Sequence, residues 1–208
     1  MAHTDIPDNV AVLELRNNAN VTTNTSLNGQ QYIANFGNNY WSFKLKTPLM
    51  EVWEFYAVYK NFFQQTAGTV TDVRLPILND AVGTVASGPV SVVNDSSTSP
   101  EYGIGVGETK IPVSGGSGTL LIGDLIKFSN HSKVYMLTED TNLDGSSVDV
   151  INITPPLVSS VAPADGSTLV TITYDNVGMQ VIAEDNVQEI KCNIAGLVQY
   201  QQKFREVI

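Results

Sequence analysis

The chain has one cysteine, two histidines and few charged residues, and each shortage excludes a class of chemistry. Cys192 has no second cysteine to pair with, which excludes an intrachain disulfide and a cysteine-based metal site. Charged residues make up 15% of the chain, with 11 Lys and Arg against 21 Asp and Glu, so the net charge is −10. A cationic nucleic-acid-binding or membrane-surface protein is therefore not expected.

Long apolar runs are also missing, and none approaches the ~18 residues of a membrane span. The first ten residues are polar and carry no signal-like apolar core, so we expect a protein made in the cytoplasm. Asn, Thr, Ser, Val and Gly are plentiful instead, which is typical of a mainly β protein with many turns. We predict two lobes. Residues 1–78 and 168–208 form a discontinuous β lobe with one helix, and residues 79–167 form an inserted small β-barrel.

The helix is predicted near residues 48–66. Thr47 is a suitable N-cap, Pro48 suits the first helical position, and Gly68 is a plausible stop. Apolar residues recur at helical spacing and predict the buried face, although further aromatic residues lie off this stripe. The predicted stripe consists of Leu49, Val52, Trp53, Tyr56, Tyr59 and Phe63. A stacking platform for a ligand is the functional alternative to this core interpretation.

Strands of the β lobe are predicted from alternation and turn residues. Residues 11–16 form an opening strand, and residues 30–36 and 39–46 form a hairpin around Gly37. Trp41, Phe43 and Leu45 alternate with polar residues and should face the core. The closing strand at 198–207 has polar residues on both faces, so only partial burial is expected.

The barrel is predicted from short apolar runs near 109–113, 119–122, 124–128, 133–138 and 147–153. The turn at Ser129–Ser132 joins two of these strands, and Pro155 and Pro156 end the last because proline lacks a backbone donor. Two further strands are predicted near 168–174 and 178–184, where the chain returns to the first lobe.

The sequence contains only weak candidates for catalytic or metal-binding residues. His131 lies beside Ser132 in a predicted turn, where adjacent residues rarely form a nucleophile–base pair. Asp140, Asn142 and Asp144 match the start of a calcium loop, but Ile151 stands where a bidentate Glu is required. A polar hairpin explains the same residues. We therefore predict no catalytic residue, no cofactor and no firm metal site, with this loop as the only calcium candidate.

A resemblance to tail and baseplate proteins of tailed bacteriophages extends over most of the chain from about residue 40. It is carried, in chain order, by Trp41–Leu45 with the aromatic helix and Val73–Pro76, by residues 123–128, 133–138 and 151–157, and by Met179–Val181 and Phe204–Val207. The middle group resembles the small β-barrel insert of these proteins. The first and last groups resemble the two halves of the lobe that carries it.

The resemblance implies a structural subunit of the phage tail tip or baseplate, with no enzymatic activity. Such subunits form homo-oligomeric rings that join the tail tube to the hub or fibres of the same virion. DNA passes through the lumen without sequence-specific binding, and we hypothesise that acidic side chains line that lumen. The alternatives are a head–tail connector or tail-completion ring protein and, less favoured, a carbohydrate-binding module or hydrolase, which would show a concave aromatic or carboxylate cluster.

Overall fold

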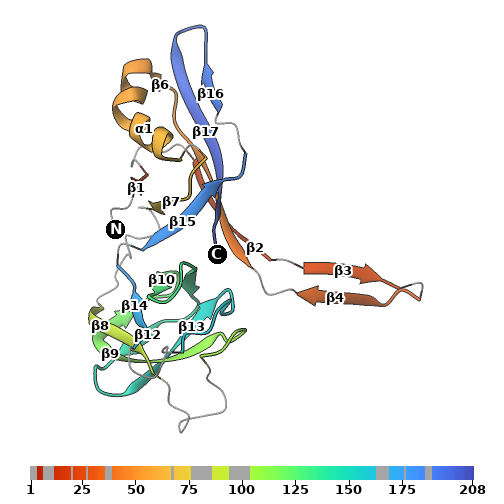
Figure 1. Cartoon of the computed structure of the whole chain (residues 1–208), viewed down its shortest axis with the longest axis vertical. Helices are drawn as coiled ribbons and strands as arrows, with labels where there is room; N and C mark the ends of the chain where they lie inside the picture. Colours follow the sequence, from red (N-terminus) through yellow and green to blue (C-terminus); the bar gives the residue numbers. More distant parts are fainter. Residues whose placement is uncertain are drawn as a thin grey trace.

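The structure is a computed structural model that describes residues 4–6, 12–19, 21–26, 28–35, 39–66, 68–75, 86–93, 104–162, 169–175, 177–185 and 189–208. It is mainly β, as predicted, with an eight-stranded sheet, a closed barrel and a separate two-stranded hairpin. Figure 1 shows the helix and the large sheet at one end of the molecule and the barrel at the other. No helix among the described residues is long and apolar enough to cross a membrane.

The eight-stranded sheet combines strands from both ends of the chain. Its order is β1-β7-β15-β17-β5-β2, and β6 and β16 also pair with β17. The strands are β1 (Thr4–Asp5), β2 (Val12–Asn18), β5 (Tyr40–Lys46), β6 (Met50–Glu51), β7 (Thr71–Arg74), β15 (Gly178–Ala183), β16 (Glu189–Cys192) and β17 (Leu197–Glu206). Since β17 lies between β5 and β15, the sheet is complete only after the chain has returned from the barrel.

Helix α1 (Val52–Thr66) covers one face of this sheet through a stripe that shares only Tyr59 and the partly buried Phe63 with the predicted one. Its core side chains are Phe55, Tyr59 and Phe62, each at most 3% exposed. Four residues of the predicted stripe are instead exposed, namely Leu49, Val52, Trp53 and Tyr56. The prediction that these four residues pack in the core is therefore wrong. The helix is apolar on more than one side, and the sheet covers only one of them.

The predicted start of the helix is also wrong. Thr47 is no N-cap, because its backbone N–H and its side-chain Oγ1 both bond to Tyr200 on β17, each at 3.0 Å. The chain then continues as β6, and the helix begins only at Val52. The predicted stop holds, since the helix ends at Thr66 and Gly68 has a φ of 70°.

Strand pairing differs from the predicted hairpin. Strand β4 (Gln31–Asn35) pairs with β3 (Val21–Thr25), whereas β5 pairs with β2 and β17. Strand β3 thus lies in a segment where no strand was predicted. The turn between β3 and β4 contains Gly29, which has a φ of 82°.

The central strands β5 and β17 bury one complete face. Trp41, Phe43 and Leu45 are at most 5% exposed, which confirms their predicted orientation. The expectation of partial burial for β17 is wrong, because Gln202 is only 3% exposed between the buried Tyr200 and Phe204. The Gln202 amide donates to backbone carbonyls of Asp185 and Lys203, at 3.3 and 3.4 Å, which lowers the cost of burying it.

The barrel consists of six strands that close on themselves through the pairing of β8 with β9. The closed ring has the order β9-β13-β11-β10-β14-β8, and β12 pairs with β9 outside it. The strands are β8 (Ser87–Val92), β9 (Lys110–Leu120), β10 (Leu125–Phe128), β11 (Val134–Leu137), β12 (Thr141–Leu143), β13 (Val148–Thr154) and β14 (Thr171–Thr173). Its own core includes Ile126, Phe128 and Ile151, all fully buried.

Two details of the predicted barrel change. The strands expected at 109–113 and 119–122 are one long strand, β9, which contains three glycines with positive φ at Gly115, Gly116 and Gly118. Strand β14 pairs with β10 and β8, so residues 171–173 complete the barrel. We therefore propose that the inserted lobe ends near residue 175 instead of at 167.

Candidate functional site

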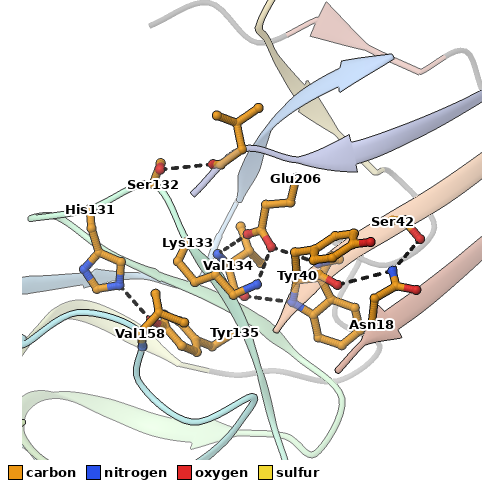
Figure 2. Close-up of polar contacts among 12 residues, drawn as sticks. Asn18, Tyr40, Ser42, His131, Ser132, Lys133, Val134, Tyr135, Val158 and Glu206 are labelled. Carbon is orange, nitrogen blue, oxygen red and sulfur yellow. Dashed lines mark hydrogen bonds and ion pairs between the residues drawn. The ribbon is translucent and has the colours of Figure 1, made fainter. Parts of the chain in front are cut away.

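The barrel and the large sheet are joined by a buried polar cluster at the C-terminal end of β17 (Figure 2). The Glu206 carboxylate forms an ion pair with Lys133, and neither side chain is exposed. The same carboxylate accepts the backbone N–H of Val134 at 2.8 Å and that of Trp41 at 3.0 Å. One side chain of the sheet thus satisfies donors from both lobes, so the junction is a specific contact.

Trp41 makes a second direct bond across this junction. Its indole Nε1 donates to the Val134 carbonyl at 2.8 Å, and the Lys133 ammonium lies 5.9 Å from the centre of its ring. Burial lowers the pKa of Lys133 from its usual 10.5, and the charge of Glu206 and its bond to the ammonium oppose that shift. The apolar surroundings are shared as well, because Leu125 and Val134 of the barrel belong to the core cluster of the sheet.

His131 lies in the β10–β11 turn, as predicted, and it bonds to partners other than Ser132. Its Nε2 is 2.9 Å from the Tyr135 hydroxyl, and its Nδ1 is 2.8 Å from the Asn130 side-chain oxygen. Ser132 donates instead to the Val207 carbonyl at 3.3 Å, on the other lobe. Burial, with Lys127 and Lys133 nearby, lowers the pKa of His131 to about 4. These bonds give the turn a role in the junction.

The carboxylates of the candidate calcium loop already accept hydrogen bonds within turns. Asp140 accepts the backbone N–H of Ile122 at 2.8 Å, and Asp144 accepts those of Ser146 and Ser147 at 2.8 and 2.7 Å. Asn142 lies in strand β12 between them. Among the described residues, no three His, Cys, Asp or Glu side chains are grouped as metal ligands. The contacts fit the polar-hairpin interpretation of this loop.

A first exposed element is the β3–β4 hairpin, which we call the arm. It forms a sheet of its own and projects away from both lobes in Figure 1. All five residues of β3 are exposed, and Val21 and Tyr32 are 43% and 61% exposed. No charged residue occurs from Asn17 to Phe43. A lone two-stranded hairpin is at best marginally stable in water, so the arm needs a surface to rest on.

A second exposed element is a groove between the start of α1 and the β16–β17 turn, with a volume of about 620 Å³. We call it the aromatic groove. Trp53 and Tyr56, 69% and 57% exposed, line it together with Leu197. The Trp53 indole donates to the Glu51 carboxylate, which fixes the ring in place. Sequence analysis favoured the core for these aromatics and named an exposed stacking platform only as the alternative. Exposed Trp and Tyr side chains are typical of the energetic centres of interfaces.

The described residues form a mainly β protein with a closed barrel, a large sheet covered by one helix, and a projecting hairpin. Residues 108–172, within the barrel, match the family model of the distal tail protein pb9, B domain. For the barrel, this match confirms the resemblance to structural proteins of the tails of tailed phages. A search of curated proteins finds no match to the chain.

Proposed function

We propose that this protein is a ring-forming subunit of a phage tail tip, located in the virion, that joins the tail tube to the hub or fibres. The arm is the observation that carries the proposal. It is an exposed, uncharged hairpin on a chain with a net charge of −10, so it meets no like-charge repulsion when it reaches another copy. The family match in the barrel supports the tail location.

The aromatic groove is the surface on which the arm of a neighbouring copy would rest. The groove supplies Trp53 and Tyr56, and the arm supplies Tyr32 and Val21 together with unpaired polar strand edges. Arm and groove are different patches, so one copy can contact the next head to tail, and repeated contacts of this kind close into a ring when the rotation between neighbours divides a full turn. A reciprocal exchange of arms would instead give a two-fold dimer, which its mass in solution distinguishes from a ring.

Light scattering over a concentration range tests this arrangement. The wild-type chain is expected to form a ring, whereas Tyr32→Ser on the arm and Trp53→Ala in the groove each shift it to monomer. Ile122→Ser is the matched control, because Ile122 is 64% exposed on the barrel and outside both patches. A wild-type chain that stays monomeric at every concentration contradicts self-assembly.

Mixing the two variants distinguishes an arm–groove contact from a groove–groove contact. Each chain in the mixture has one intact patch, so a heterologous contact yields a dimer with one Tyr32→Ser chain and one Trp53→Ala chain. A contact of groove with groove would yield no such dimer, and that result would reject the arm as the partner.

The position of the subunit in purified particles distinguishes the tail tip from the alternative of a head–tail connector or tail-completion ring. We also propose that the protein acts without catalysis, because the bonds of His131, Ser132 and Asp144 are structural. A carbohydrate-binding module remains the third candidate, since the aromatic groove is concave. Binding of soluble glycans that Trp53→Ala abolishes would favour it.

A further inference from the structure

Basic residues are concentrated on the face of the large sheet opposite helix α1. Residues directly opposite on neighbouring strands share a face, and the pairs Lys203↔Lys44 and Arg205↔Ser42 alternate with buried core residues. On β2, Arg16 is opposite Ser42 in the same way. On the three strands β2, β5 and β17, five of the 11 basic residues occupy this side, which we call the basic face: Arg16, Lys44, Lys46, Lys203 and Arg205.

Acidic residues balance this charge only in part on these three strands. Glu14 is opposite Lys44 and forms an ion pair with Arg16 at 2.9 Å, and Glu184 lies near Lys203. On the flanking strands the same register rule places Asp72, Glu189 and Glu51 beside Arg74 and Lys191, so the excess of positive charge is confined to β2, β5 and β17. Lys44 and Lys203 are directly opposite each other, an arrangement of like charges that Glu14 and Glu184 relieve only in part.

The basic face contains a recess of about 260 Å³. Three cations and one anion line it, together with Asn18 and Ser42: Arg16, Lys44, Lys203 and Glu184. Lysine, arginine, serine and asparagine are the side chains that most often contact phosphate oxygens. Along β5 and β17 the cations are two residues apart, which spaces them by about 6.8 Å, or twice the ~3.4 Å axial rise per phosphate of one DNA strand.

The partner of this face is better matched by nucleic acid than by protein. Large apolar side chains exposed among the described residues lie elsewhere, on the arm, the groove, the barrel and chain ends. A protein interface needs apolar or aromatic anchors at its centre, whereas protein–DNA interfaces are polar and strongly positive. We propose that the basic face contacts the phosphate backbone of double-stranded DNA without sequence preference. The inference rests on the proposed tail function, which brings the ring to the DNA that passes along the tail.

The proposal revises the hypothesis of an acidic lumen. The net charge is a sum over the whole chain and does not show where the charges lie. Strand pairing brings together cations that are far apart in the sequence. Because the rest of the chain is acidic, it repels DNA and orients it toward the basic face. Contacts limited to a few phosphates are weak and readily broken, which suits DNA that must move past.

Fluorescence anisotropy of a short labelled duplex, titrated with the full chain at low salt, tests the inference. We expect binding that weakens steeply with salt, with the double variant Lys44→Gln/Lys203→Gln lowering affinity about tenfold and the salt slope by about 2. The matched control is Lys60→Gln/Lys110→Gln, which changes the charge equally at exposed sites outside the face. A scrambled duplex must bind equally well.

Equal effects of the two double variants, or no binding at low salt, would overturn the inference. Binding of poly-glutamate but not of DNA would also overturn it and would identify an acidic protein as the partner. Light scattering of the same samples keeps this test apart from the proposed function. A ring that does not bind DNA refutes only the basic face, whereas a monomer that binds DNA refutes only the ring.

Discussion

Lys133 of the barrel and Glu206 of the large sheet form an ion pair that solvent does not reach from either side. The two residues are 73 positions apart in the chain, and their side chains meet only when both lobes are folded. The carboxylate also accepts two backbone N–H groups, so its acceptor sites are well used. The pair therefore couples the position of the barrel to the folding of β17.

Glu206→Gln should destabilise the protein strongly. The substitution leaves the Lys133 ammonium buried without a counter charge, a loss that typically costs about 3–5 kcal/mol. The free energy of unfolding from urea denaturation measures this effect. Because the pair spans the lobes, fluorescence of Trp41 at the junction should change in the same transition.

Two variants serve as controls for this prediction. Glu189→Gln removes the partner of Lys191 in an ion pair whose side chains are 55% and 62% exposed, and should cost less than about 1 kcal/mol. Lys133→Met combined with Glu206→Gln removes both charges and should recover much of the loss. Equal costs for Glu206→Gln and Glu189→Gln would show that the junction pair is not buried in solution.

Stability should fall as the pH is lowered from about 6.5 to about 4, with His131 contributing. The pKa of His131 is about 4 in the folded protein against 6.5 for the ordinary side chain. Between these values the unfolded chain binds the extra proton and the folded chain does not, so acid favours unfolding. Urea denaturation across this range should show a shallower pH dependence for His131→Gln than for wild type. Parallel curves would contradict a neutral, buried imidazole.

Strands in which apolar side chains face the core and polar side chains face solvent could be predicted from the sequence. Strand β5 is such a case, because Trp41, Phe43 and Leu45 all face one apolar core. Strand β17 is different, since its buried face includes Gln202 and Glu206, whose partners come from other segments. A buried polar residue cannot be recognised from its own strand when the group that satisfies it is remote in sequence.

Helix α1 shows a second limit of sequence reasoning. Apolar and aromatic residues lie all around it, so periodicity predicts a helix but does not decide which side is covered. Packing against the sheet selects Phe55 and Tyr59, and leaves Trp53 exposed in the aromatic groove. The exposed aromatic residues of the candidate assembly site therefore belong to a stripe whose periodicity predicts core residues. The predicted hairpin of residues 30–36 with 39–46 is wrong for a related reason. Strand β5 pairs instead with β17, which comes from the far end of the chain.

Calcium should have no effect on stability. The Asp144 carboxylate accepts two backbone N–H groups and the Ser147 hydroxyl, and these bonds lower its pKa to about 2. Asp140 is likewise bonded to Ile122. Thermal denaturation with excess Ca²⁺ and with a chelator should give the same midpoint. A midpoint that rises with Ca²⁺, and no longer does so in Asp144→Asn, would restore the calcium loop.

Glycines in strand β9 should be indispensable where the strand bends to close the barrel. Gly116 has a φ of 67°, and an added Cβ would lie 2.7 Å from Cγ2 of the fully buried Val90. Gly116→Ala thus combines backbone strain with overpacking, and should cost about 2–4 kcal/mol. The free energy of unfolding from chemical denaturation gives the measurement.

Substitutions at two other glycines separate the cost of backbone strain from the cost of overpacking. Gly123 has a φ of 91° with nothing within 4 Å of an added Cβ, so Gly123→Ala should show backbone strain alone, about 1–2 kcal/mol. Gly105 has neither a positive φ nor a close neighbour, and Gly105→Ala should be neutral or slightly stabilising. The order of cost is therefore Gly116, then Gly123, then Gly105. If Gly116→Ala were as mild as Gly105→Ala, β9 would not lie as close to Val90 of β8 as the structure has it.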